Sequence, residues 1–134
     1  MEILLDEQIH TAFKEALQTQ VNVFSIKDKQ WKGLSNGTLR EKLNDENFDF
    51  FLTSDKNIPF QQNIKKMNFT IILIDTPSLR AAKQLSFVSI IQDLLENLPD
   101  TLPKIFHVSI LEFNNVRYIE KLKIRFTSDE IFFI

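Results

Sequence analysis

Short apolar runs, separated by segments with helical periodicity, recur along the 134 residues of this chain. The runs are residues 2–5, 21–25, 49–53, 69–74 and 105–111. Each run is too short for a buried helix and has the length of a strand that is covered on both faces. Strands that alternate with helices are joined by right-handed crossovers, so neighbouring strands lie parallel. We therefore expect a three-layer α/β/α fold around a central, mostly parallel sheet of about five strands.

The segments between the runs contain helix start and stop signals. We expect helices that begin near Ile9, follow a cap at Asn36 or Thr38, cover residues 57–67, and extend from Thr76-Pro77 to Pro99. Residues 27–37 are polar and contain both glycines, so they are predicted to be a loop.

The last residues follow a different pattern. Leu122, Ile124 and Phe126 alternate with three cations, Lys121, Lys123 and Arg125. An alternation of period two is typical of a strand with one solvent-exposed face, and a turn is expected around Asn114-Asn115. We therefore expect residues 1–111 to form the α/β domain and residues 112–134 to add an antiparallel β extension to it, with residues 131–134 pairing in that extension.

Composition excludes several classes of protein. The chain has no cysteine, so thiol catalysis and zinc-finger or disulfide frameworks are excluded. It opens with Met-Glu, and none of its apolar runs approaches the ~18 residues that a membrane span needs. We therefore expect a cytoplasmic protein with no membrane association. The net charge of -2 argues against a protein that coats nucleic acid, although a local basic face remains compatible with RNA binding.

Three of the apolar runs end on a carboxylate. Asp6, Asp55 and Asp75 each stand at the carboxyl end of a predicted strand. In an open parallel sheet these ends meet at the edge where ligands bind. Carboxylates held close together need a cation among them, and hard oxygen ligands favour Mg²⁺ or Mn²⁺. Taken singly, each acid is better explained as the N-cap of the next helix, but three of them in one small domain favour a shared site.

Three stretches of the sequence are distinctive: Leu-Leu-Asp-Glu at residues 4–7, Trp-Lys-Gly-Leu-Ser-Asn-Gly at 31–37, and Phe-Asp-Phe-Phe-Leu-Thr-Ser-Asp-Lys-Asn-Ile-Pro-Phe-Gln-Gln-Asn at 48–63. Together they resemble a PIN-like family of small, mostly uncharacterised bacterial proteins. The resemblance extends over residues 1–110. It implies a metal-dependent endoribonuclease, often the toxin of a toxin–antitoxin pair. It also implies that Asp6 and Asp55 are the catalytic metal ligands and that Asn57 lies beside them.

The chain departs from the family pattern at one position. Relatives commonly read Asn-Gly-Glu where this chain reads Asn36-Gly37-Thr38, so an acid expected on the second helix is absent. Glu41 lies one helical turn further on and either supplies the missing ligand or is a solvated surface residue. Asp75 stands where the wider PIN pattern has a fourth acid. The predicted metal ligands are therefore Asp6, Asp55, Asp75 and Glu41.

Several polar residues are candidates for substrate binding. Neutral amides near a metal site are suited to hydrogen bonds with phosphate or ribose, and a wet helix face is the alternative. Trp31 in a lysine-rich loop can stack on a base, or it can fill the edge of the core beneath the loop. The predicted substrate-binding residues are Asn36, Asn57, Gln61, Gln62, Trp31 and Lys32. His10 and His107 have no serine or acid at triad spacing and are interpreted as structural.

The leading hypothesis is a ribonuclease in which Mg²⁺ or Mn²⁺ activates water, with RNA as the substrate and an antitoxin protein as a partner. A catalytically silent PIN-like binding or regulatory module is the alternative, and Thr38 favours it. A receiver-like signalling domain ranks lower because the lysine expected after the fifth strand is absent and Lys104 stands before that strand. A homodimer is the default expectation for a small intracellular domain.

Overall fold

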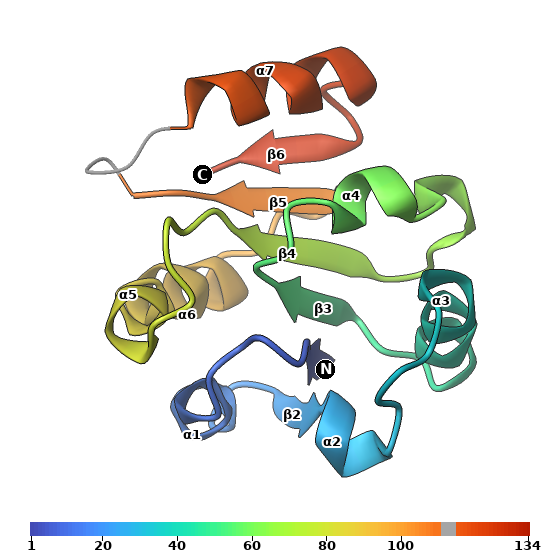
Figure 1. The fold of residues 1–134 in the computed structure, drawn as a ribbon, viewed down its shortest axis with the longest axis vertical. Coiled ribbons are helices and arrows are strands. Elements are labelled where there is room, and N and C mark those ends of the chain that lie inside the picture. The colour runs from blue at the N-terminus through green and yellow to red at the C-terminus, as the bar shows by residue number, and fades with distance from the viewer. Residues whose placement is uncertain (111–114) are drawn as a thin grey trace.

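A six-stranded sheet lies between two layers of helices in the computed structural model, which describes residues 1–110 and 115–134 (Figure 1). The strands are β1 (Glu2–Leu5), β2 (Asn22–Ser25), β3 (Phe50–Thr53), β4 (Thr70–Ile74), β5 (Ile105–Val108) and β6 (Ile131–Phe133). All neighbouring strands are parallel, and their order is β2-β1-β3-β4-β5-β6. The predicted α/β class and parallel sheet are therefore confirmed, with one strand more than expected.

The helices divide between the two faces of the sheet. One face is covered by α1 (Ala12–Leu17), α5 (Ala81–Leu85) and α6 (Val88–Glu96). The other is covered by α2 (Ile26–Lys29), α3 (Asn36–Asp45), α4 (Ile58–Gln61), the 3₁₀ helix η1 (Ile64–Lys66) and α7 (Val116–Arg125). Side chains alternate between these faces along each strand, so Phe50 packs with the first layer and Phe51 with the second. Both cores are filled by aliphatic and aromatic residues, which explains why the strands read as continuous apolar runs.

The prediction for the C-terminal residues is wrong. No antiparallel extension is present in residues 115–134; they form helix α7 and the parallel strand β6. Tyr118, Leu122 and Phe126 are buried at a spacing of four residues, which is a helical repeat, whereas Ile124 is 87% exposed. Asn115 caps α7 by accepting the Tyr118 N–H at 3.3 Å. Leu111, Asn114 and the predicted boundary between residues 111 and 112 lie outside the described residues.

Several helix boundaries also differ from the prediction. The predicted loop contains α2, which a capping box between Ser25 and Asp28 stabilises. Ser35, and not Asn36 or Thr38, caps α3 by accepting the Thr38 N–H. The predicted helix over residues 57–67 is divided into α4 and η1, and the helix expected from Pro77 begins at Ala81 and is divided into α5 and α6.

The order of the strands indicates where a ligand of this sheet would bind. The first five strands follow the doubly wound order 2-1-3-4-5, in which the connections switch direction between β1 and β3. Ligands of such sheets bind outside the carboxyl ends of the strands at this switch point. Asp6 directly follows β1 and Asp55 follows β3, so both acids stand there.

Among the described residues, no helix has both the length and the apolar character that a membrane span requires.

Candidate functional site

Asp6 and Asp55 are joined through one hydroxyl group. The Thr53 hydroxyl donates to Oδ2 of Asp6 at 2.6 Å and accepts the backbone N–H of Asp55 at 3.0 Å. Thr53 is fully buried at the end of β3, so its hydroxyl is held in place by the sheet. The Asp6 N–H donates to the Leu52 carbonyl at 2.9 Å, which continues the pairing of β1 with β3 beyond the strand. The two acids are therefore fixed to the same pair of strands.

The surroundings of Asp6 disfavour its ionised form. Burial raises the pKa of the Asp6 carboxyl above its ordinary value, and the hydrogen bonds from Thr53 and from the Glu7 N–H only partly oppose this rise. The negative charges of Asp55 and Glu7 raise the pKa of Asp6 further. A carboxylate that is partly desolvated and close to another carboxylate is stabilised by a cation placed between them.

The turn after β3 also supplies polar groups. The Ser54 hydroxyl is buried and has no hydrogen-bond partner within the described part of the chain. Oδ1 of Asp55 accepts the Asn57 N–H at 2.9 Å, which orients this carboxylate. An unpartnered buried hydroxyl beside two oriented carboxylates fits a site that holds a hydrated Mg²⁺ or Mn²⁺, because Mg²⁺ retains several of its waters when it binds to one or two carboxylates.

Asp75 has a different role from the one predicted. Its side chain is fully buried, with Oδ1 2.8 Å from the Lys56 ammonium and Oδ2 3.0 Å from Nε2 of His107. Because an ionised carboxylate only accepts, Nε2 of His107 is the donor. Burial alone would raise the pKa of Asp75, but the hydrogen bonds from His107 and Lys56 outweigh it and hold that pKa below its ordinary value. Both oxygens are thus engaged by cationic or donor groups, and we leave Asp75 out of the proposed metal site.

Tyr118 connects α7 to this part of the molecule. Its hydroxyl donates to the Lys56 carbonyl at 2.7 Å. Burial raises the pKa of Tyr118, and the charges of Asp75 and Asp55 raise it further. The Lys56 ammonium lies 5.8 Å from the centre of the Tyr118 ring, within the range of a cation–π contact. The helix that the sequence did not predict therefore packs directly against the loop that follows Asp55.

The four predicted acids do not form one cluster. Glu41 is exposed on α3, and no hydrogen bond or ion pair with a described residue connects it to the other acids. Across residues 1–110 and 115–134, no group of three or more acidic, histidine or cysteine side chains is placed to hold a metal ion. Of the four acids, only Asp6 and Asp55 are joined through a common hydrogen-bond partner, the Thr53 hydroxyl.

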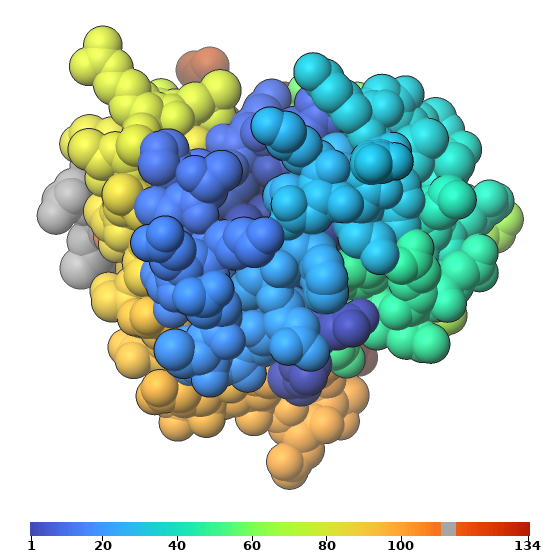
Figure 2. Space-filling model, turned by 90° about the horizontal axis from the view of Figure 1, so that it is seen from below, coloured from blue at the N-terminus to red at the C-terminus, as the bar shows by residue number. Residues whose placement is uncertain are grey.

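A hollow of about 620 Å³ opens beside Asp6 and Glu7. Lys27 and Lys32 also line this hollow, and the substrate-binding role expected of Lys32 stays a prediction. In Figure 2 the darker blue surface of the first residues lies recessed between the blue of α1 and the lighter blue of α2. The lining of this hollow therefore combines two carboxylates, Asp6 and Glu7, with two cations, Lys27 and Lys32.

Trp31 is part of the core and not of this surface. It is 7% exposed and makes an edge-to-face contact with Phe48, with ring centres 6.0 Å apart. The predicted role in base stacking is therefore wrong, because the indole face is covered. The alternative interpretation, a tryptophan that fills the core edge beneath the loop, is the observed one.

The predicted substrate-binding amides are close together but bond mainly to each other. Nδ2 of Asn36 donates to Oε1 of Gln61 at 2.8 Å, and Nε2 of Gln62 donates to the Asn36 carbonyl at 2.8 Å. Gln62 is 5% exposed and also accepts from Arg40 at 3.4 Å. Gln62 therefore holds α3 against α4, whereas Gln61 and Asn57 remain exposed.

Sequence reasoning missed Lys56 and Tyr118. Lys56 directly follows Asp55, which was a signal that this cation lies at the same edge of the sheet. Tyr118 gave no such signal, because its residue range was interpreted as part of a strand. His107 was interpreted as structural, and its buried hydrogen bond to Asp75 agrees with that interpretation. The His10 imidazole accepts the Ala12 N–H at 3.1 Å on an exposed helix start.

In comparisons with known proteins, the chain matches no protein-family model, no curated protein and no solved structure. A functional conclusion therefore depends on the geometry of the site and on the motifs in the sequence.

Proposed function

We propose that this protein is a metal-dependent endoribonuclease of the PIN-like type, with Asp6 and Asp55 as the ligands of one Mg²⁺ or Mn²⁺ ion. The observation that carries this proposal is the Thr53 hydroxyl, which bonds to the carboxylate of Asp6 and to the backbone N–H of Asp55 where β1 and β3 end. The resemblance of residues 4–7, 31–37 and 48–63 to PIN-like proteins supplies the substrate class, RNA. It also supplies the further proposal that the protein is the toxin of a toxin–antitoxin pair.

The chain's own residues have separate roles in this proposal. A bound cation supplies an activated water and offsets negative charge on the scissile phosphate. Asp6 and Asp55 would hold the cation, and the buried Thr53 hydroxyl restricts the rotation of the Asp6 carboxylate. Lys32 and Lys27, which line the same hollow as Asp6, attract the phosphate.

The test is an RNA cleavage assay with Mn²⁺ that compares the wild type with Asp6→Asn and Asp55→Asn. We expect each substitution to reduce cleavage at least ~100-fold, because the remaining carboxylate binds the cation weakly. Asn is close in size to Asp, but its single oxygen can accept only one of the two hydrogen bonds that Asp6 accepts, from Thr53 and from the Glu7 N–H. The melting temperature of metal-free Asp6→Asn therefore checks that this variant is folded. Equal cleavage by all three proteins would place the activity in a contaminant or at another site.

The alternative is a PIN-like module without catalysis that binds a partner or regulates it. The ion pair of Asp75 with Lys56 favours it, since that acid is neutralised within the fold, and Thr38 at the expected acid position favours it too. Absence of cleavage together with absence of Mn²⁺ binding would support this module over the nuclease.

A receiver-like signalling domain is a third candidate, because the 2-1-3-4-5 strand order is also found in receiver domains. In such a domain Asp55 would accept a phosphoryl group, and a lysine would follow the fifth strand. Ser109 follows β5 in this chain, and Lys104 precedes it. Incubation with acetyl phosphate followed by intact-mass measurement distinguishes this function, and we expect no phosphorylated species.

A further inference from the structure

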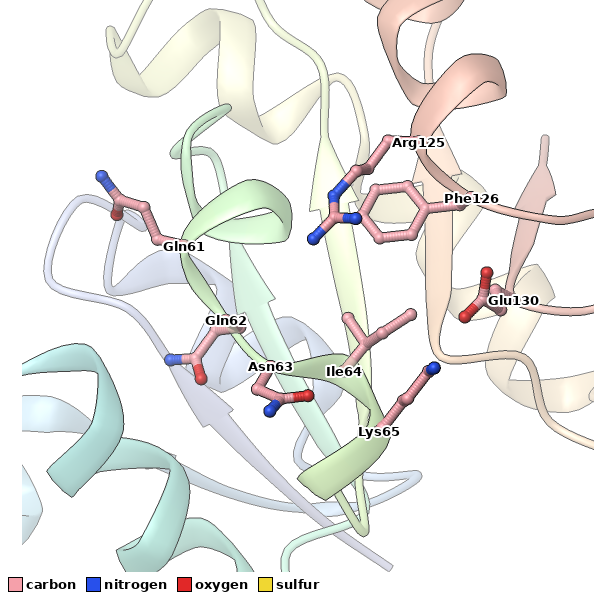
Figure 3. Close-up of a pocket in the computed structure, with 8 residues that line it drawn as sticks. All are labelled: Gln61, Gln62, Asn63, Ile64, Lys65, Arg125, Phe126 and Glu130. Atoms are coloured by element: carbon pink, nitrogen blue, oxygen red, sulfur yellow. The ribbon is translucent and has the colours of Figure 1, made fainter.

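A groove separates α7 from the segment formed by α4 and η1. One hollow of about 460 Å³ lies between Lys56, Asn57 and Phe60 on one wall and Tyr118, Lys121 and Ile124 on the other. A second hollow of about 420 Å³ has Gln61 and Lys65 on one wall and Arg125 on the other. Figure 3 shows Arg125 extending from the end of α7 toward α4 across this second hollow.

The two hollows follow each other along the same two walls. Gln61 follows Phe60 on one wall, and Arg125 follows Ile124 on the other. Phe60 lines the first hollow and Phe126 the second, and their rings lie 6.0 Å apart, so apolar surface connects the two hollows. The groove begins at Lys56 and Asn57, the residues directly after Asp55, so it leads away from the candidate site.

The walls of the groove are positively charged. Lys121 and Arg125 stand one turn apart on α7, a rise of ~6 Å along the helix axis, and Lys65 lies on the facing wall. Within the described residues none of these three cations forms a salt bridge. Glu130 is the carboxylate of the second hollow, and it accepts the Thr127 N–H at 2.9 Å. This local excess of positive charge contrasts with the net charge of -2 of the chain.

Apolar and amide groups lie among the cations. Ile124 is 87% exposed and Phe60 is partly exposed, so both present apolar surface to a ligand. The exposed amides of Gln61 and Asn63 add donors and acceptors. Grooves that bind single-stranded nucleic acid combine cations that contact the phosphate backbone with apolar side chains that contact the bases. Amides add contacts to base edges and to the ribose hydroxyl.

We propose that this groove binds a single strand of RNA, with Lys121, Arg125 and Lys65 contacting successive phosphates. A strand whose scissile phosphate lies at Asp6 and Asp55 would continue past Asn57 and along α7. The identity of the ligand rests on the proposed ribonuclease function. The groove itself depends on α7, which lies beyond the residues that carry the family resemblance.

The test measures binding without cleavage. Fluorescence anisotropy of a labelled single-stranded oligouridine of roughly 12 nucleotides is followed in the Asp6→Asn background, without divalent metal. The groove variant is Lys121→Gln with Arg125→Gln. The control is Lys42→Gln with Lys83→Gln, which removes the same charge from exposed positions on α3 and α5. All four cations are exposed, and circular dichroism checks that both variants fold.

We expect the groove variant to bind roughly tenfold more weakly and its salt slope to fall by about 1.4, as expected for two lost phosphate contacts. The control variant should bind like its parent. Equal affinities of the two variants, or no binding by the parent, would overturn the groove. Cleavage that depends on Asp6 and Asp55 together with an unaffected groove variant would leave the ribonuclease standing without this groove. Binding that the groove variant weakens, without any cleavage by the wild type, would support the groove and contradict the ribonuclease function.

Discussion

The acids at the carboxyl edge of the sheet differ in what neutralises them. Asp75 is compensated inside the protein by Lys56 and His107. Asp6 accepts hydrogen bonds from the Thr53 hydroxyl and the Glu7 N–H, and the negative charge of Asp55 raises its pKa. The same edge thus combines a closed ion pair with two carboxylates whose charge is left for a ligand to offset.

Asp75→Asn tests the closed ion pair. The substitution leaves the Lys56 ammonium beside a neutral amide, and removing one partner of a largely buried pair destabilises the fold, here by roughly 2 kcal/mol. Urea unfolding measures the free energy of unfolding, and Asp100→Asn at an exposed site is the control. A loss no greater than that of the control would show that the pair is not stabilising.

The same variant has a defined pH dependence. The pKa of Asp75 is lowered in the folded protein, so the unfolded state binds more protons in the acid range. The stabilisation is therefore complete above the ordinary pKa of 3.8 and is lost as the pH falls through the lower pKa of the folded state. Asp75→Asn should remove this acid-range dependence, and the difference in stability between wild type and variant should shrink toward low pH.

Thr53→Val tests the hydroxyl that joins the two acids. Valine keeps the shape of threonine, but the Asp6 carboxylate and the Asp55 N–H lose their shared partner. We expect the affinity for Mn²⁺ to fall at least ~10-fold, the effect of removing a group that orients a metal ligand.

Thr70→Val is the matched control for this experiment. Thr70 is 3% exposed, and its hydroxyl donates to the Pro103 carbonyl at 2.7 Å at the start of β4, away from the acids. It should lower stability by about 1 kcal/mol without changing the affinity for Mn²⁺. Equal Mn²⁺ affinities of the Thr53→Val and Thr70→Val variants would show that the Thr53 hydroxyl does not contribute to metal binding.

At the scale of elements, the first five strands were predictable because each lies in a short, mainly apolar stretch of the sequence. Their parallel arrangement was predictable from the helical segments between them. The position of Asp6 and Asp55 at one edge followed directly, since it depends only on where β1 and β3 end. The pairing of Asp75 was not predictable, because Lys56 and His107 reach it from two other segments of the chain.

The C-terminal helix shows where the pattern misled. Lys121 to Phe126 alternates with period two, but the same residues place Leu122 and Phe126 four apart, one helical turn. The choice depended on whether Ile124 faces the core. Ile124 is exposed in the structure. Because these residues were assigned to a strand, neither the role of Tyr118 nor the cationic wall of the groove could be predicted.

Leu122→Ala and Ile124→Ala distinguish the helix from the predicted strand. In the helix Leu122 is fully buried and Ile124 is 87% exposed, whereas a strand would place both on one face. We expect Leu122→Ala to lower the free energy of unfolding by about 2–4 kcal/mol and Ile124→Ala to change it by less than about 0.5 kcal/mol. Similar losses for the two variants would favour the strand.

At the scale of the whole molecule, α7 and β6 complete the core and do not merely extend the edge. Tyr118, Leu122, Phe126 and Ile131 belong to the same buried cluster as the strand residues Phe51 and Ile71. Through Tyr118 this cluster also supports the loop that carries Asp55 and Lys56. The site and the C-terminal segment are therefore parts of one folded unit.

Binding of Mn²⁺ to the metal-free protein tests the central claim, that Asp6 and Asp55 share one cation. Calorimetric titration, together with the melting temperature, reports both binding and the stabilisation it gives to the native state, about 2.7 kcal/mol at a hundredfold excess over Kd. We predict one site in the wild type, its loss in Asp6→Asn and in Asp55→Asn, and its retention in Asp75→Asn. No binding by the wild type at millimolar Mn²⁺, or binding by either the Asp6→Asn or the Asp55→Asn variant that is as tight as that of the wild type, would contradict the account.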